Sequence, residues 1–249
     1  NLSDFDPAAH ALPPTEWLEI DRYAVLRCRA LCDGSHDGEN LFEAYAQYRF
    51  HAITHALHQY CSEELGGFYL DILKDRLYTA GADSRARRAA QNALFYITHA
   101  LLRLFAPILS FTAEEAWYAI AGSKDNSIFE QTFTELPAIA DAERIAAKWQ
   151  TIKSVRAAVQ KELETVRAAG QIGSSLAAEV EISAAGDVYE ILTGLGDDLR
   201  LVLIVSQARV IRGTDNDPVI RVSPSPHAKC ERCWHYRADV GSNADHPSI

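Results

Sequence analysis

Two cysteines near the end of the sequence have the spacing of a metal-binding pair. Cys230 and Cys233 stand in the segment KCERCWHY, and a C-x-x-C spacing can place both thiolates on one tetrahedral metal ion. A structural zinc site takes four ligands. Three histidines could supply nitrogen ligands, although none has a diagnostic spacing: His227, His235 and His246. The spacing therefore predicts half of a zinc knuckle, and the alternative is a pair of unligated or redox-active thiols.

An aromatic side chain among cations follows the cysteine pair. Trp234 lies close in the sequence to Lys229, Arg232 and Arg237. Indole rings stack on unpaired nucleobases while neighbouring cations meet phosphates. The pattern therefore predicts an RNA contact at Arg232 and Trp234, and the alternative is that the indole packs over the metal knuckle.

Basic side chains gather in two further stretches. Residues 74–90 carry five basic and two acidic side chains, and residues 144–170 carry six basic and two acidic ones. Cations clustered in this way can contact the phosphates of a nucleic acid. The candidates are Lys74, Arg76, Arg85, Arg87 and Arg88 in the first stretch, and Lys153 and Arg156 in the second. The alternative is a solvated helix end whose charges pair along the helix.

Other reactive side chains do not make a catalytic site. His51, His55 and His58 share one helical face, but no HExxH glutamate accompanies them, so a polar-aromatic face within a bundle explains them better. Cys28 and Cys32 are best explained as small buried hydrophobic residues. The sequence contains no Ser/His/Asp grouping, phosphate loop or supported pair of carboxylates. We therefore expect no catalysis by this chain alone.

The composition is that of a globular protein. Of the 249 residues 48% are hydrophobic, and no apolar run approaches the roughly 20 residues of a membrane span. Five cysteines with one recognisable pair argue against a secreted disulfide framework, so we expect a cytoplasmic protein. The sequence has no Met and begins at Asn1 in a loop-like segment, which suggests a piece of a longer protein. The net charge of −10 leaves only the local basic regions to attract a polyanion.

A helix, a proline and a second helix form the central corner of the predicted fold. Apolar residues spaced three and four apart predict a long helix over residues 85–106, capped by Asp83 or Ser84. Pro107 should end that helix, because proline lacks the N–H that a helix interior needs. Thr112 and Glu115 have the spacing of a capping box and predict the start of the next helix.

The remaining elements follow from periodicity and turn residues. Helices are predicted over residues 15–31, 40–60, 68–78 and 138–169, with an interruption at Gly66-Gly67. The irregular residues 122–137 are expected to be anchored by Phe129 and Phe133. Strands are predicted over residues 176–183, 199–205 and 208–211, with a short helix over 187–195.

The predicted fold is mainly α. Residues 1–137 are expected to form a helical bundle, and residues 138–214 a long helix with a small α+β subdomain. Residues 215–226 contain three prolines and predict a linker. Residues 227–249 then form a truncated zinc knuckle, a partial zinc-binding module.

Several segments resemble one known family. The segment from Arg87 to Trp117, RRAAQNALFYITHALLRLFAPILSFTAEEAW, resembles the anticodon-binding helical domain of class Ia aminoacyl-tRNA synthetases. The segment FYLDILKDRLYT is similar to the preceding helix of that domain, and NLSDFDP and GQIGSSLAAEVEI match as well. The ending KCERCWHY is similar to the C-terminal zinc module of bacterial isoleucyl-tRNA synthetases, which the valyl and leucyl relatives lack. The resemblance covers nearly the whole chain.

The resemblance implies a function and a set of partners. The parent enzyme, expected to be monomeric, would attach isoleucine to tRNA(Ile) with ATP and Mg and would edit mischarged valine. This sequence lacks the HIGH-type and KMSKS-type signatures and any editing insertion, so it corresponds to the anticodon-recognising part, with no DNA or membrane as partner. Cys230 and Cys233 match the family's first zinc pair, and the second pair is expected after Ile249. The alternative is a non-catalytic helical module whose zinc knuckle binds protein.

Overall fold

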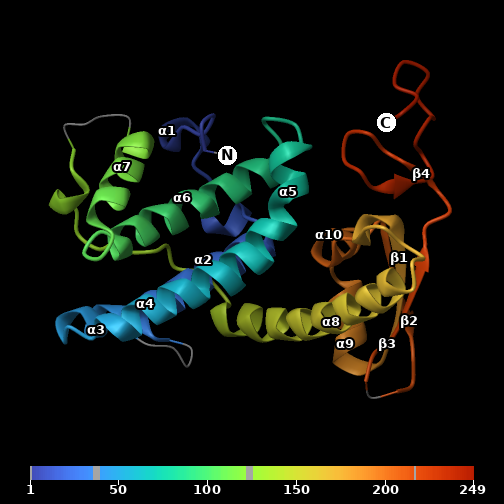
Figure 1. The fold of residues 1–249 in the computed structure, drawn as a ribbon, viewed down its shortest axis with the longest axis horizontal. Helices are drawn as coiled ribbons and strands as arrows, with labels where there is room; N and C mark the ends of the chain where they lie inside the picture. The colour runs from blue at the N-terminus through green and yellow to red at the C-terminus, as the bar shows by residue number, and fades with distance from the viewer. Residues whose placement is uncertain (1, 36–39, 122–125, 216) are drawn as a thin grey trace. The chain divides into compact units, whose positions relative to one another are not determined.

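The chain folds into two compact units, Asn1–Ile145 and Ala146–Ile249, in this computed structural model (Figure 1). The structure describes residues 2–35, 40–121, 126–215 and 217–249. Helices make up most of the first unit, and the second contains a small sheet, so the prediction of a mainly α fold with an α+β part is confirmed. Across these described ranges, no helix has both the length and the apolar character needed to span a membrane.

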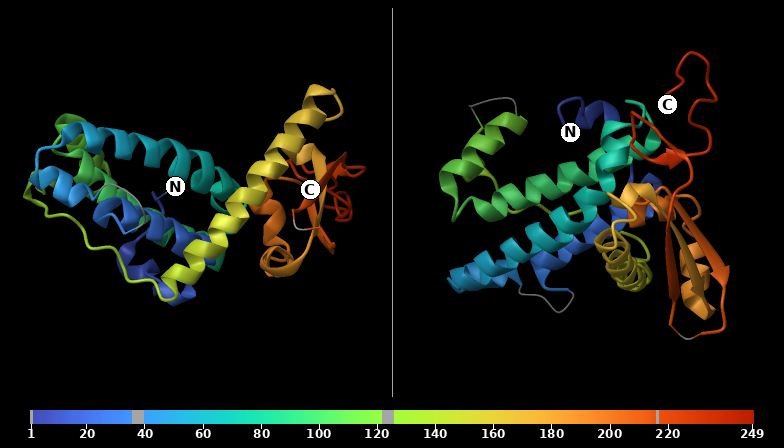
Figure 2. Two further views of the ribbon diagram at one scale, coloured as in Figure 1. Left: turned by 90° about the horizontal axis from the view of Figure 1, so that it is seen from below. Right: turned by 45° about the vertical axis from the view of Figure 1, so that its right-hand side comes forward.

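The first unit is built from helices joined by short connections. Its α6 (Arg85–Phe105) packs along α2 (Glu19–Asp33), as Figures 1 and 2 show. The other elements are α1 (Pro7–His10), η1 (Pro14–Glu16), α3 (Leu41–Ala46), α4 (Phe50–Gln59), the π-helical η2 (Tyr60–Leu70), α5 (Asp71–Tyr78), α7 (Ser110–Ala121) and η3 (Ile128–Glu130). Helix α8 (Ala142–Ala168) begins in this unit and continues into the second.

The long helix α6 begins and ends where local signals predict. The Ser84 side chain accepts a hydrogen bond from the backbone N–H of Arg87 at 3.3 Å, which caps the helix. The helix ends at Phe105, and a turn containing Pro107 follows it. Serine and proline therefore act here through the local backbone chemistry that the sequence indicates.

The predicted capping box is wrong. Helix α7 begins at Ser110, so Thr112 lies inside its first turn instead of preceding it. The Ser110 hydroxyl donates a hydrogen bond to the carbonyl of Ala106 at 3.0 Å. The tight turn after α6 thus leads into α7 earlier than the Thr112 and Glu115 spacing suggests. The predicted terminator of this helix, Gly122, falls outside the described residues.

The predicted helix over residues 40–60 is broken in one place and extended in another. Asn40 caps α3 by accepting a hydrogen bond from the N–H of Glu43 at 3.0 Å. The chain then turns at Tyr48, whose φ of 56° is left-handed, before α4 begins. Beyond α4, η2 runs through Gly66-Gly67 into α5, so the predicted interruption is wrong. Glycine suits this crowded turn, because a Cβ on either residue would lie 3.0 Å from a backbone carbonyl oxygen.

The core of the first unit includes Val25, Cys28, Leu41, Ile53, Leu73, Ala93 and Ile97. The irregular stretch after α7 attaches to the unit through one of its two predicted anchors, Phe133. Phe133 packs against Phe42 and Tyr45, with ring centroids 5.0 and 5.7 Å apart. Phe129 is not an anchor, because it stays 58% exposed while its neighbour Ile128 is buried.

The second unit is a three-stranded sheet packed on helices. Strand β1 (Ala178–Ala184) is central, parallel to β2 (Gln207–Arg212) and antiparallel to β3 (Val219–Pro224). A short turn, η4 (Ser175–Ala177), precedes β1, and α9 (Gly186–Thr193) lies against the sheet (Figure 2). Val180 and Ile182 of β1 share a core with Val159 and Leu163 of α8. The predicted strand over residues 176–183 and helix over 187–195 are confirmed.

The predicted strand over residues 199–205 is a helix. Residues Asp198–Leu203 form α10, in which Leu199, Val202 and Leu203 are buried at helical spacing. The intervening Arg200 pairs with Asp197 at 3.0 Å and stays out of the core. A continuous apolar run fits a buried strand and a buried helix equally well, and the packing of this unit selects the helix.

The predicted linker over residues 215–226 is also wrong. Strand β3 occupies most of it, with Val222 opposite Val180 of β1. Pro218 precedes the strand and Pro224 ends it. Because β3 is an edge strand, it tolerates proline at positions that need not donate to a neighbouring strand.

Candidate nucleic-acid interface and metal knuckle

Arg76, one of the predicted RNA contacts, is buried inside the first unit. Its guanidinium donates to the two carboxylate oxygens of Asp21 at 2.9 and 2.8 Å, and the Tyr69 hydroxyl donates to the same carboxylate at 2.8 Å. Burial and the nearby Asp21 raise the pKa of Tyr69 well above its usual value. Arg76 therefore ties α5 to α2. Its burial argues against both the predicted phosphate contact and the alternative of a solvated helix end at this position.

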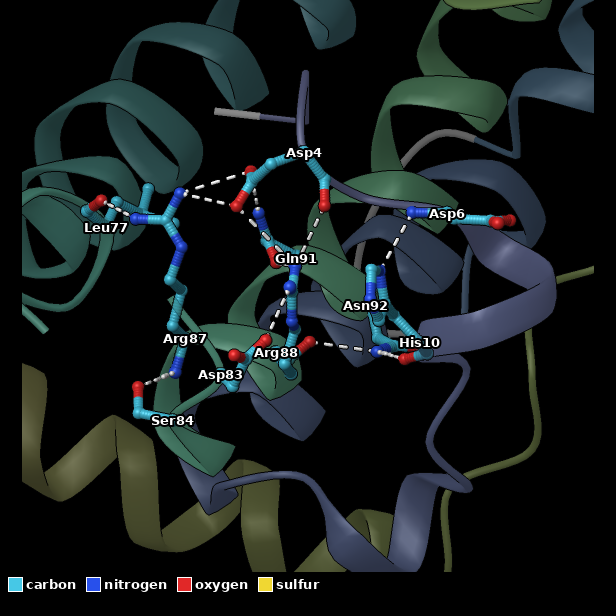
Figure 3. A network of polar contacts seen from close by, with 10 residues as sticks. All are labelled: Asp4, Asp6, His10, Leu77, Asp83, Ser84, Arg87, Arg88, Gln91 and Asn92. Carbon is cyan, nitrogen blue, oxygen red and sulfur yellow. Dashed lines mark hydrogen bonds and ion pairs between the residues drawn. The ribbon is translucent and has the colours of Figure 1, made fainter. Parts of the chain in front are cut away.

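Arg87 and Arg88 belong to a polar network with the N-terminal segment (Figure 3). The Nη2 of Arg87 lies 3.1 and 3.0 Å from the carboxylate oxygens of Asp4, and its Nη1 donates to the carbonyl of Leu77. Arg88 donates to the Asp4 carbonyl and to the Asp83 carboxylate, both at 3.0 Å. Only 17% and 12% of the two side chains is exposed, so both arginines mainly join segments of the fold.

The same network continues along α6. Gln91 donates to the Asp4 carboxylate at 2.8 Å, and Asn92 donates to the carbonyl of His10 at 2.9 Å. Burial alone would raise the pKa of Asp4, but hydrogen bonds from Arg87 and Gln91 hold it below its usual value. The N-terminal segment is thus fastened to α6 by charged and amide groups.

Two basic side chains of this cluster stay at the surface. Lys74 extends from α5 with 68% of its side chain exposed and its Nζ 2.6 Å from Asp71. Arg85, the first residue of α6, is exposed and donates from Nε to the carbonyl of Glu16 at 3.0 Å. The five predicted cations therefore divide into three that hold the fold together and two that face solvent.

The basic flank of α8 divides in the same way. Arg156 is buried and donates from Nε to the carbonyl of Val202 in α10 at 3.0 Å. Lys153, one turn earlier, is half-buried. Arg156 therefore joins α8 to α10, and of the two predicted contacts only Lys153 keeps part of its side chain in solvent.

Cys230 and Cys233 lie in a tight turn between two short strands, β4 (Ala228–Lys229) and β5 (Tyr236–Arg237). The N–H of Trp234 donates to the carbonyl of Cys230 at 2.9 Å and closes the turn. Burial alone would raise the pKa of Cys230, but hydrogen bonds from the backbone of Cys233, Arg232 and Trp234 hold it below its usual value. Because the thiolate is the form that binds zinc, the turn suits Cys230 as a zinc ligand, and the C-x-x-C spacing places Cys233 in the same turn as a second one.

The histidines do not complete a metal site within the part of the chain that the structure describes. No group of three or more His, Cys, Asp or Glu side chains could hold a metal ion there. His227 faces Glu179, its Nε2 3.7 Å from the carboxylate, and His235 is buried behind the turn. His51, His55 and His58 are all exposed on α4, so they do not form the polar-aromatic bundle face that their spacing suggests.

Trp234 projects from the knuckle. Its side chain is 61% exposed, and its φ of 65° is left-handed. The Nζ of Lys229 lies 5.2 Å from the centre of the indole ring, and the exposed Arg232 is two residues away. An exposed indole beside cations is an arrangement on which an unpaired base can stack.

Comparison with known proteins assigns both regions. Residues 39–182 match a family model described as the anticodon-binding domain of tRNA ligase. This chain belongs to that family. The anticodon-binding domain model covers more than half of the chain, from the start of α3 into β1. Residues 229–249, which include the cysteine pair and Trp234, match a model described as a zinc finger found in FPG and IleRS.

Individual relatives within the tRNA ligases agree with this assignment. Isoleucine–tRNA ligases from Cupriavidus taiwanensis and Cupriavidus metallidurans are each 53% identical over 252 residues, covering 100% of this chain and 26% of the relative. The isoleucine–tRNA ligase of Nitrosomonas europaea is 52% identical over 254 residues with the same coverage. The chain thus spans about a quarter of the length of the curated relatives it matches. The resemblance to isoleucyl-tRNA synthetases is confirmed.

Sequence reasoning located the cations of the anticodon-binding domain but missed their acidic partners. Asp21 lies three residues before Ala24 and seven before Cys28, so it is an acid on the apolar stripe of α2. Such a position signals a buried ion pair, because an unpaired carboxylate there would be costly. Asp4 carried no comparable signal, since it lies outside any periodic element.

Proposed function

We propose that this chain is the part of an isoleucine–tRNA ligase that binds the anticodon arm of tRNA(Ile). The observation that carries the proposal is the succession, in one chain, of an anticodon-binding helical domain and a zinc finger. The exposed Trp234 with its neighbouring cations supports the proposal. Anticodon bases are unpaired, so they can stack on an aromatic ring and be read at their edges.

The proposed contacts divide by chemical type. Trp234 stacks on a base, and the solvent-reaching cations bind phosphates: Lys74, Arg85, Lys153 and Arg232. The four remaining arginines act indirectly by holding helices and the N-terminal segment in place: Arg76, Arg87, Arg88 and Arg156. Phosphate contacts of this kind set affinity and position, and base contacts set specificity.

The zinc part of the proposal assigns Cys230 and Cys233 as two of four ligands, with the second pair supplied by a part of the ligase outside these residues. A bound zinc ion supplies a structural cross-link that fixes the turn carrying Trp234. In the intact ligase, Cys230→Ser should lower bound zinc, measured by atomic emission, whereas Cys61→Ser, a control thiol of the helical unit, should not. If both variants bind as much zinc as the parent protein, Cys230 is not a zinc ligand.

Catalysis is assigned to segments of the ligase outside this chain. We propose that those segments attach isoleucine to tRNA with ATP and Mg and edit valine, in a monomeric cytoplasmic enzyme. The role of the present chain is to orient the tRNA, because holding one end of a rigid substrate restricts where its other end can go. None of the five cysteines, all of which the structure describes, forms a disulfide, which fits a reducing compartment.

A binding titration tests the central proposal. The protein is titrated with tRNA(Ile) and with the same tRNA carrying an altered anticodon, using fluorescence anisotropy between about 50 and 200 mM salt. We expect tighter binding of the native anticodon and a steep loss of affinity with salt, since phosphate contacts release counterions. A DNA hairpin of the same sequence should bind more weakly. Equal affinity for the two tRNAs would overturn the proposal and favour a protein-binding module.

A further inference from the structure

An exposed aromatic residue ends α5, beside one of the surface cations. Tyr78 is the last residue of this helix and is 68% exposed. Lys74 precedes it by four residues, and residues at this spacing are neighbours on one helix face. Both side chains are exposed, so this face of α5 presents an aromatic ring, a phenolic hydroxyl and a cation together.

The backbone around Tyr78 is held on both sides. The carbonyl of Leu77 accepts a hydrogen bond from Arg87 of α6, drawn in Figure 3. The backbone N–H and the hydroxyl of Thr79 both donate to the carbonyl of Asp75, at 2.9 and 2.6 Å. The ring of Tyr78 therefore stands on a fixed segment of chain, although the ring itself lies mostly in solvent.

The loop that follows is also closed by hydrogen bonds. The N–H of Ser84 donates to the carbonyl of Gly81 at 3.0 Å, and the Ser84 side chain caps α6. Arg88 reaches back to the Asp83 carboxylate at 3.0 Å. At the far end of this loop stands Arg85, the second exposed cation of the corner. The backbone of the α5–α6 corner is thus held by hydrogen bonds. Along the sequence, Tyr78 lies between the two exposed cations Lys74 and Arg85.

We propose that Tyr78 stacks on an unpaired nucleobase of RNA and that Lys74 binds the adjoining phosphate. A ring that is 68% exposed buries little area in the core, so most of its surface is available to a ligand. The backbone that carries the ring is already fixed, so binding need not order it, and every base offers a face for stacking. Lys74 can bind a backbone phosphate by exchanging its present partner, the Asp71 carboxylate 2.6 Å from its Nζ, for a phosphate oxygen. This inference rests on the proposed function, because an anticodon loop supplies unpaired bases.

Substitutions at Tyr78 separate the aromatic ring from its bulk. Tyr78→Phe keeps the ring, Tyr78→Leu keeps apolar bulk without it, and Tyr78→Ala removes both. The matched control is Tyr48→Ala, which removes a tyrosine that is 78% exposed in the turn between α3 and α4. With the anticodon stem-loop of tRNA(Ile) as ligand, we expect about tenfold weaker binding for Tyr78→Leu and Tyr78→Ala. Tyr78→Phe should bind within about twofold of the parent protein, because its ring can still stack. Tyr48→Ala should also stay within about twofold, because Tyr78 is unchanged in it.

Salt dependence separates stacking from charge. Lys74→Ala should reduce the slope of log affinity against log salt by about one, whereas Tyr78→Leu should leave the slope unchanged. A 2-aminopurine placed at successive positions of the loop reports the stacked base, because stacking quenches its fluorescence. We expect quenching at one position with the parent and Tyr78→Phe, and its loss with Tyr78→Leu.

Two outcomes overturn the inference, and both differ from failure of the proposed function. If Tyr78→Leu binds the stem-loop like the parent while the parent still discriminates the anticodon, Tyr78 does not stack and its face is left for a protein partner. If Tyr78→Phe binds as weakly as Tyr78→Leu, the hydroxyl and not the ring carries the contact. Loss of anticodon discrimination by the parent itself would instead overturn the proposed function.

Discussion

The helical unit and the C-terminal knuckle use similar residue types in opposite ways. In the helical unit, Arg76 and Arg87 form ion pairs with acidic residues that lie far away in the sequence, Asp21 and Asp4. In the knuckle, Arg232 is exposed, and Trp234, two residues later, keeps 61% of its side chain in solvent. The difference shows that a basic cluster inside a long helical domain can serve the fold first, whereas the knuckle buries Cys230 and His235 and leaves Arg232 and Trp234 exposed.

The physical cause of this difference is the depth of the packing. Residues on α5 and α6 lie next to α2 and the N-terminal segment, so a long arginine side chain meets backbone carbonyls and carboxylates before it reaches water. The knuckle consists of two short strands and a turn, in which Lys229 lies beside the indole of Trp234 and Arg232 is exposed. Loss of a cation should therefore cost stability in the first region and RNA affinity in the second.

The largest effect is expected from Arg76→Ala. This change leaves the fully buried Asp21 carboxylate without its guanidinium partner, which typically costs about 3–5 kcal/mol of folding free energy. Chemical denaturation monitored by circular dichroism measures the loss. Lys74→Ala, on the exposed face of the same helix, is the control and should cost less than about 0.5 kcal/mol. A small effect of Arg76→Ala on stability would contradict the structural role.

Trp234→Ala should have the reverse pattern. Removing a stacked indole is expected to weaken tRNA binding about tenfold, because base–aromatic stacking contributes about 1–3 kcal/mol. The folding free energy should change by less than about 0.5 kcal/mol, since the ring is 61% exposed. Anisotropy titration and denaturation of the same sample measure the two quantities. A large loss of stability with unchanged affinity would favour packing over the knuckle.

His99 tests whether the stability of the helical unit depends on the protonation of a partly buried side chain. Burial, with help from Arg103, lowers its pKa from 6.5 to about 4. The unfolded chain therefore takes up a proton between about pH 6.5 and 4 that the folded chain does not, so stability should fall as the pH drops through this window. The effect should be on the order of 1 kcal/mol after allowance for solvent screening of a partly exposed ring.

His99→Gln provides the comparison for that measurement. The variant cannot take up the proton in either state, so its stability should fall less than that of the parent between about pH 6.5 and 4. Thermal melting of both proteins at a series of pH values measures the difference. Carboxyl groups titrate in both proteins, so their contribution is removed when the two curves are subtracted. Parallel curves for the two proteins would show that protonation of His99 does not oppose folding.

The smallest effect is expected from Thr112→Ala. The sequence pattern assigns Thr112 a capping role worth about 1 kcal/mol, but α7 already begins at Ser110 and the Thr112 side chain is exposed. We therefore expect a change of less than about 0.5 kcal/mol. Ser84→Ala is the matched control, because Ser84 does cap α6 and should lose about 1 kcal/mol. Equal losses in the two variants would contradict the observed start of α7.

Much of the fold could be predicted because its signals act over a few residues. The caps at Asn40 and Ser84 and the stop before Pro107 depend on backbone groups within one helical turn. The alternation that marks β1 depends on neighbours two residues apart. Where two local structures fit the same pattern, as in residues 199–205, the sequence could not choose between them.

Local patterns in the sequence predict the helices of the anticodon-binding domain, the cysteine pair and the positions of the cations. Which of these cations face solvent depends on tertiary packing, because their partners lie tens of residues away: Asp21 for Arg76 and Asp4 for Arg87. Tertiary packing also decides that Tyr78 is exposed on a fixed corner. Burial depends on what packs against a residue, and that is a property of the assembled chain and not of the local pattern.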